Sequence, residues 1–260
     1  MGFAAMIPWL MLAVYGARLP RRRLAAAAVM CLGLCLSMAG QLFLLWQDGL
    51  LNVATGLPLH ICGMMAALSL ILVWQKQGWI YELSLYIGMP CALLALVFPA
   101  VIASSRPPLM ASHFNRVHGL ILCVGLFVFL KNKTLPVSGR RAFLLGSVYL
   151  WCVWLINPII GSNYLFLRVA PAGTPLVCLM EKGELYLMCS YEMLAIMMIS
   201  LMGSLWQKAA KSLTFAGSRR ACSRWCRYSL PCTSPNRAPE WLPAWRKAPG
   251  PEPDRRRDPA

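Results

Sequence analysis

The chain has 260 residues, of which 58% are hydrophobic and 13% charged, and its mean hydropathy is +0.58. This balance excludes an ordinary soluble globular domain. The formal net charge of +16 would suit nucleic-acid binding, but twelve of the 25 Lys and Arg residues lie between Lys208 and Arg257, and the others flank apolar runs. Basic residues in that position set the orientation of membrane helices, so we expect no nucleic-acid partner.

Hydrophobic residues fall in seven runs, each of a length that approaches or reaches what is needed to cross a bilayer. The runs cover residues 2–17, 24–46, 54–74, 79–100, 109–130, 142–160 and 185–206. The sequence therefore predicts an all-α fold, a polytopic transmembrane bundle of about seven helices formed by residues 1–206. Residues 207–260 are rich in Pro and Arg and lack helical periodicity, so we expect a basic, disordered tail.

Lys and Arg residues are unevenly distributed between the two sides of the predicted bundle. Four follow the first run, four follow the fifth and twelve follow the seventh, whereas none follows the second. Because cytoplasmic loops carry the excess of positive charge, this pattern predicts a multi-pass cell-membrane protein with its N-terminus outside and its C-terminus in the cytoplasm.

The eleven cysteines give no pattern of a metal site or a disulfide framework. Seven lie inside apolar runs, where cysteine is a small packing residue. The three in the tail, Cys222, Cys226 and Cys232, lack the paired spacing of zinc ligands. We expect no metal and no cofactor.

With the predicted orientation, polar side chains from four runs meet in the outer leaflet. Ionisable groups are costly inside a membrane and are expected to have a function there. The residues that we interpret as a candidate site are His60 and Cys62 in the third run, His113, Asn115 and His118 in the fifth, Asn157, Asn163 and Tyr164 at the end of the sixth, and Glu192 in the seventh.

The spacing of these residues suggests roles for some of them. Cys62 and His60 would lie about 200° apart on a helix that begins near Pro58, so they do not form a local dyad. Asn115 and His118 would share a helix face, so the carboxamide can orient the imidazole. This makes Cys62 the candidate nucleophile and His118 its base, with Asn115 in support. The competing interpretation is that Cys62 only packs.

The other polar residues are candidates for binding substrate: His60, His113, Asn157, Asn163, Tyr164 and Glu192. His113 could equally be a loop residue at the level of the lipid headgroups, and Asn163 and Tyr164 could cap the sixth helix. We expect Glu192 to pair with His60 or Arg116, because a carboxylate at that depth needs a partner or a proton.

Two motifs, Leu57-Pro58-Leu59-His60-Ile61-Cys62 and Asn163-Tyr164-Leu165-Phe166-Leu167, resemble those of the YwaF-like integral membrane proteins. The resemblance extends to about Trp206 and includes the 113–119 segment. It implies the chemistry of an animal branch that acts on ether phospholipids as an acyltransferase through an acyl-cysteine, with His118 as the partnering histidine. That branch has its cysteine directly before the first histidine, where this chain has Leu59.

Three functions remain open from the sequence. The first is a phospholipid acyltransferase or acyl hydrolase that uses Cys62 and His118, with membrane lipids as partners. The second is a small-solute or proton-coupled transporter that uses the same polar groups. The third is a structural membrane component in which these groups only join helices through hydrogen bonds.

Overall fold

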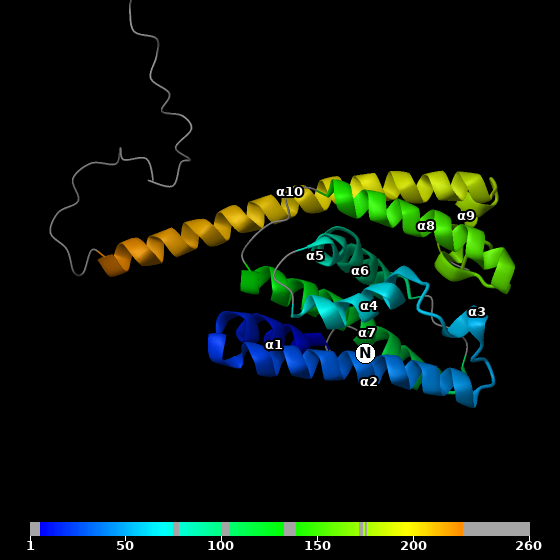
Figure 1. Cartoon of the computed structure of the whole chain (residues 1–260), viewed down its shortest axis with the longest axis horizontal. Helices are drawn as coiled ribbons and strands as arrows, with labels where there is room; N and C mark the ends of the chain where they lie inside the picture. The colour runs from blue at the N-terminus through cyan, green and yellow to red at the C-terminus, as the bar shows by residue number, and fades with distance from the viewer. Residues whose placement is uncertain are drawn as a thin grey trace, which may run out of the picture. The chain divides into compact units, whose positions relative to one another are not determined.

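A computed structural model describes residues 6–74, 78–99, 104–132, 139–171, 174 and 176–225, with the side chains of 210–225 excepted. The chain divides into two compact units, 1–215 and 216–260. The described residues form helices and contain no strand, which confirms the all-α prediction for that part of the chain. In chain order the helices are α1 (Ile7–Arg18), η2 (Pro20–Arg22), α2 (Arg23–Gln47), α3 (Val53–Gly56), α4 (Ile61–Leu72), α5 (Trp79–Leu83), the π-helical segment η3 (Ser84–Gly88), α6 (Met89–Val97), α7 (Pro107–Asn132), α8 (Arg140–Ile160), η4 (Tyr164–Phe166), α9 (Leu176–Met180) and α10 (Glu184–Trp225) (Figure 1).

Five helical stretches of the described chain are long and apolar enough to cross a membrane. They are Pro20–Gln47, Trp79–Val97, Pro107–Asn132, Arg140–Ile160 and Glu184–Ala209. The apolar helix α4 is shorter, and α1 has 12 residues. The structure therefore supports a polytopic membrane protein, while the count of seven spans and the orientation stay predictions.

The third predicted run is not one helix. Val53–Gly56 forms the single turn α3, residues Leu57 to His60 are extended, and α4 begins only at Ile61. The prediction that Pro58 belongs to the first helical turn is therefore wrong. The residue preceding a proline is pushed into an extended conformation, and Leu57 has φ −73° and ψ 145°. His60, the last residue before α4, is also extended, with φ −71° and ψ 143°.

The seventh predicted helix is longer than expected. Helix α10 continues through Trp225, so its C-terminal part runs beyond the predicted boundary at Trp206. Segment 207–225 contains good helix formers such as Ala, Lys, Leu and Arg, and it has no proline. The rest of the predicted tail, from Cys226 on, falls outside the described residues.

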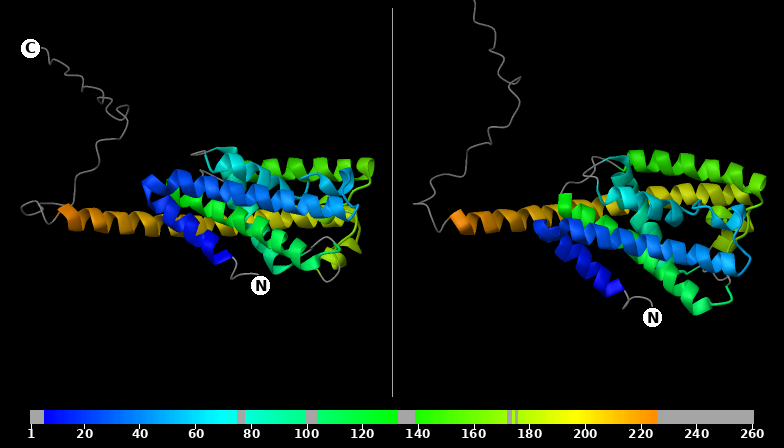
Figure 2. Two further views of the ribbon diagram at one scale, coloured as in Figure 1. Left: turned by 90° about the horizontal axis from the view of Figure 1, so that it is seen from below. Right: turned by 60° about the horizontal axis from the view of Figure 1, so that its bottom comes forward.

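Helix α7 is the centre of the first unit. It packs against α1, α2, α4 and α6, and Figure 2 shows it beside α2 in both views. Its middle contributes fully buried side chains such as Leu120, Ile121 and Val128. A second, smaller cluster joins α8, η4 and α10 through Val153, Tyr164 and Leu187. Outward faces of α8 and α10 carry exposed large apolar residues, as expected for surfaces that face lipid.

Candidate functional site

The two sequence motifs pack against each other at one end of the helical unit. At the right-hand end of Figure 1, α3 lies near the C-terminal ends of α2 and α8. The backbone N–H of Leu57 donates to the Tyr164 hydroxyl over 3.0 Å, and that hydroxyl donates to the carbonyl of Val53 over 2.8 Å. One buried phenol thus joins the extended 57–60 segment to the turn that follows α8.

A buried asparagine holds that turn in place. Asn157, fully buried on the last turns of α8, donates from Nδ2 to the carbonyl of Tyr164 and accepts from the Tyr164 N–H, each over 2.9 Å. The Ser162 hydroxyl also donates to its Oδ1, over 2.7 Å. Gly161 allows the chain to leave α8 here because its φ is +64°, which an L side chain rarely adopts.

The turn itself carries backbone strain. Leu165 and Phe166 have φ of 58° and 56°, in the left-handed region that costs a residue other than glycine of order 1 kcal/mol or more. Surrounding contacts hold this conformation, because the Tyr191 hydroxyl of α10 donates to the carbonyl of Leu165 over 2.9 Å. Non-glycine residues in such conformations cluster at functional sites.

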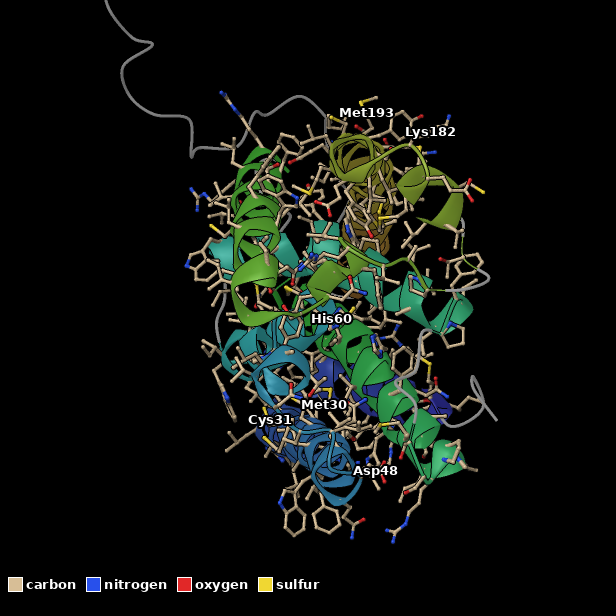
Figure 3. All side chains as sticks on the ribbon, turned by 90° about the vertical axis from the view of Figure 1, so that its right-hand side faces the viewer. Met30, Cys31, Asp48, His60, Lys182 and Met193 are labelled. Atoms are coloured by element: carbon tan, nitrogen blue, oxygen red, sulfur yellow. The ribbon has the colours of Figure 1, made fainter. Side chains whose placement is uncertain are left out.

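His60 lies inside this network. It is the N-terminal cap residue of α4, and Figure 3 shows it among the packed helices. The N–H of Leu165 donates to its Nδ1 over 3.3 Å. Its ring contacts Tyr164 edge to face with centroids 5.2 Å apart, and Phe166 with centroids 5.0 Å apart. Because an amide N–H can only donate, Nδ1 carries the lone pair and Nε2 carries the hydrogen of the neutral ring.

His118 has the opposite tautomer. Its Nδ1 lies 2.7 Å from the carbonyl oxygen of Phe114, one turn earlier on α7. A carbonyl can only accept, so Nδ1 carries the hydrogen and Nε2 has the free lone pair. His118 lies on α7, which packs against α4, the helix that His60 caps. Two packed helices therefore carry one imidazole able to donate from Nε2 and one able to accept a proton at Nε2.

Phe114, not Asn115, orients His118. The carbonyl of Phe114 binds Nδ1, and its ring stacks on the imidazole with centroids 4.0 Å apart. Among the described residues no hydrogen bond joins Asn115 to His118. The carbonyl of residue i−4 lies nearer on the helix than a side chain three residues away, and this local partner was missed because it depends on the backbone.

Cys62 lies on the first turn of α4, two residues after His60, and is half-buried. Helix α4 also packs against α6, which carries Cys91. No hydrogen bond between Cys62 and His118 occurs in the part of the chain that the structure describes. Among the described residues, the N–H groups of Ile61, Cys62 and Gly63 have no acceptor. These groups lie on the first turn of α4, and His60 caps that helix without a side-chain hydrogen bond.

The remaining predicted residues lie around this centre in different ways. Asn163 closes its own loop, since Oδ1 accepts from the N–H groups of Arg168 and Val169, each over 3.0 Å, and its amide donates to Val169. The expected pairing of Glu192 with His60 or Arg116 is wrong. Its Oε2 accepts from the hydroxyl of Ser147 on α8 over 2.6 Å, because α10 packs beside α8 at that level.

His113 is not a loop residue, because it lies on α7, where Nη2 of Arg116 donates to its Nδ1 over 3.1 Å. Two further site residues were missed from the sequence. Tyr149 donates to the carbonyl of Leu59 over 2.9 Å, and Tyr191 donates to Leu165 as described above. Their one signal in the sequence is a phenol inside an apolar run, since a buried hydroxyl needs a partner.

No described group of three or more His, Cys, Asp and Glu side chains is arranged to hold a metal ion. An apolar cavity of about 240 Å³ lies between α1, α6 and α7, lined by Met6, Ile7, Leu10, Met89, Leu122, Cys123 and Leu126. It shares no residue with the polar centre around His60.

Comparison with known proteins decides the family. A family model described as the TMEM164 family matches residues 1–203. The chain belongs to the TMEM164 family. This match covers α1 to α9 and most of the apolar part of α10, so every described residue of the polar centre lies within the matched residues. Searches of the curated proteins and of the solved structures found no match.

Proposed function

We propose that this TMEM164 family protein transfers an acyl chain from a phospholipid within the membrane, at the centre formed by His60, Cys62 and His118. The observation that carries the proposal is the complementary state of the two imidazoles. A proton acceptor and a hydrogen-bond donor on two packed helices are what acyl transfer requires, because a nucleophile must lose a proton while the carbonyl oxygen gains negative charge.

Each group has a defined part in the proposed reaction. Nε2 of His118 takes the proton of the Cys62 thiol, and the sulfur attacks the ester carbonyl of the lipid. His60 Nε2–H, with free N–H groups on the first turn of α4, stabilises the oxyanion. The C–O bond then breaks, the lysophospholipid alkoxide takes the proton from His118, and a thioester remains on Cys62.

The second half of the reaction reverses these roles. His118 removes a proton from the hydroxyl of an acceptor lysophospholipid or from water, and this oxygen attacks the thioester. The thiolate of Cys62 leaves and recovers its proton from His118. The position of the centre among apolar helices supports a lipid substrate, because a nucleophile there is reached from the bilayer.

The test is covalent labelling of the purified full chain by a phospholipid with a radiolabelled acyl chain. We expect label that neutral hydroxylamine releases, and we expect Cys62→Ser to lose that thioester. Cys91→Ser, which changes the neighbouring thiol, and Cys123→Ser on α7 are matched controls that should keep it. His118→Ala should slow labelling by about 10²–10⁴-fold.

Two results would contradict parts of this proposal. If Cys62→Ser still forms product at the wild-type rate, the acyl-cysteine step is wrong, and the two histidines act directly on water or the acceptor. If the wild type takes up no label and forms no product from a broad panel of phospholipids, acyl transfer itself is wrong.

A further inference from the structure

Arg116 is a cation on a membrane-spanning helix without a carboxylate partner. It lies about 14 Å along α7 from Pro107, at about 1.5 Å per residue. Among the described residues the ion pair that forms is Arg141 with Glu82, and no carboxylate lies within ion-pair distance of Arg116. A guanidinium cannot lose its proton at this depth, so it requires an anion or access to the headgroup region.

The Arg116 side chain is bent towards the start of α7. Its Nε donates to the carbonyl of Ser112 over 3.3 Å, and its Nη2 donates to Nδ1 of His113 over 3.1 Å. This direction carries the guanidinium towards the headgroup level, as long basic side chains do in membranes. Because arginine only donates, Nδ1 of His113 holds the lone pair and Nε2 carries hydrogen.

Two sets of N–H donors therefore have no hydrogen-bond acceptor among the described residues. They are the Nη1 group of Arg116 and the Nε2–H of His113. The ring of His113 is fixed in place by α2, since a Cβ added to Gly40 would lie 2.3 Å from its Cε1 atom. The pair is thus a preformed group of donors between α2 and α7.

The donors face away from the proposed acyl-transfer centre. His113 and Arg116 are three residues apart and share one face of α7, whereas His118 lies about 200° around the helix from Arg116. The nearby acid Asp48 is already bound by Ser104 and Ser105. The anion that is abundant at this level of a bilayer is the phosphodiester of a phospholipid, and a planar guanidinium suits its oxygens.

We propose that Arg116 and His113 bind the phosphate of a membrane phospholipid between α2 and α7, at a site separate from the His60–His118 centre. Arg116 supplies the charge and two fork-like donors, and His113 supplies a neutral donor and holds the guanidinium in position. The inference does not depend on the proposed acyl transfer, and its test needs no catalytic activity.

The test is thermal unfolding of the purified full chain in neutral detergent with three added probes. They are dioctanoyl phosphatidylglycerol, dioctanoylglycerol, which lacks the phosphate, and inorganic phosphate. We expect Tm to rise with the concentration of the phospholipid only, because a ligand of the folded state stabilises it by mass action. An equal rise with inorganic phosphate would overturn the proposal in favour of a free-phosphate site.

Variants identify the residues responsible. Arg116→Gln should weaken the response about tenfold or more in phospholipid concentration, and Gly40→Ala should weaken it by displacing His113. Arg106→Gln is the matched control, since Arg106 lies at the same end of α7 but donates to Gln47. Should Arg116→Gln fail to fold, Arg116→Lys decides, because it keeps the charge and loses the fork. An unchanged response in the Arg116 variants would overturn the proposal.

Discussion

The N–H of Leu165 donates to Nδ1 of His60 over 3.3 Å. This bond joins the 163–167 motif to the 57–62 motif and fixes the tautomer of the His60 imidazole. It leaves the Nε2–H of His60 as a donor, opposite to His118, whose Nδ1 is bound to Phe114. His60 therefore has two separable roles, since Nδ1 anchors a strained turn and Nε2 is available for chemistry.

Two substitutions of His60 should separate these roles. The Asn carboxamide places an acceptor near the position of Nδ1, so His60→Asn should keep the fold and lose about 10²–10³-fold in acyl-transfer rate with the missing Nε2–H donor. The Gln carboxamide reaches the position of Nε2, so His60→Gln should keep more activity and unfold at a lower temperature. The assay is product formation alongside thermal unfolding of each variant. Equal activity and equal Tm in both variants would contradict the division of roles.

Tyr164 should contribute stability through its hydroxyl. Tyr164→Phe removes an acceptor for Leu57 and a donor for Val53, which leaves the part-buried N–H of Leu57 without its acceptor. We expect the free energy of unfolding to fall by about 1–2 kcal/mol. Tyr186→Phe is the control, because Tyr186 is exposed and its contact with Lys182 uses the ring. Thermal unfolding of the two variants in the same detergent gives the comparison, and equal losses would rule out a special role for Tyr164.

The convergence of polar groups was predictable because membrane insertion limits where they can lie. Once apolar runs were placed across a bilayer, His60, His118 and Asn157 had to lie near the same end. In the structure, hydrogen bonds connect Asn157, the Tyr164–Leu165 backbone and His60 in one network. The apolar runs alone were enough for this prediction, without any side-chain contact.

The partners within the site could not be predicted in the same way. Helical periodicity suggested that Asn115 orients His118, but a backbone carbonyl does so, and every residue type offers a carbonyl. Glu192 bonds Ser147 because α10 packs on α8, a pairing that loop charges do not reveal. The break before Ile61 was signalled by Pro58, but the extended length after it depends on the Tyr149 and Tyr164 contacts.

The hydrogen bonds to Asp48, between α2 and α7, predict that the stability of the folded state depends on pH. Hydrogen bonds from the Ser104 and Ser105 hydroxyls, with the Ser105 N–H and the charge of Arg106, hold the pKa of Asp48 below its ordinary value of 3.8. A carboxyl whose pKa is lower in the folded state stabilises that state above pH 3.8. The stabilisation is lost as pH falls from 3.8 through the lower folded value.

The measurement for Asp48 is thermal unfolding between pH 3 and pH 6, compared with Asp48→Asn. The wild type should lose stability over the acidic part of this range by an amount that the variant lacks. Ser105→Ala is expected to reduce the difference, because it removes one of the donors to the carboxylate. Identical pH profiles for wild type and Asp48→Asn would show that the carboxylate does not contribute.

Native Cys178 tests the predicted orientation of the bundle. Cys178 is exposed on α9, just before α10, at the same end of the unit as the His60 network. Arg21 is also exposed, at the turn between α1 and α2. Loop charges predict that the His60 end faces the outside of the cell. With Cys222, Cys226 and Cys232 changed to Ser, an impermeant maleimide should label intact cells through Cys178, and Cys178→Ser should abolish this label. Arg21→Cys, added to the Cys178→Ser background, should react only after the membrane is permeabilised. The opposite pattern would place the proposed acyl-transfer centre in the cytoplasmic leaflet and reverse the side from which its lipid substrate enters.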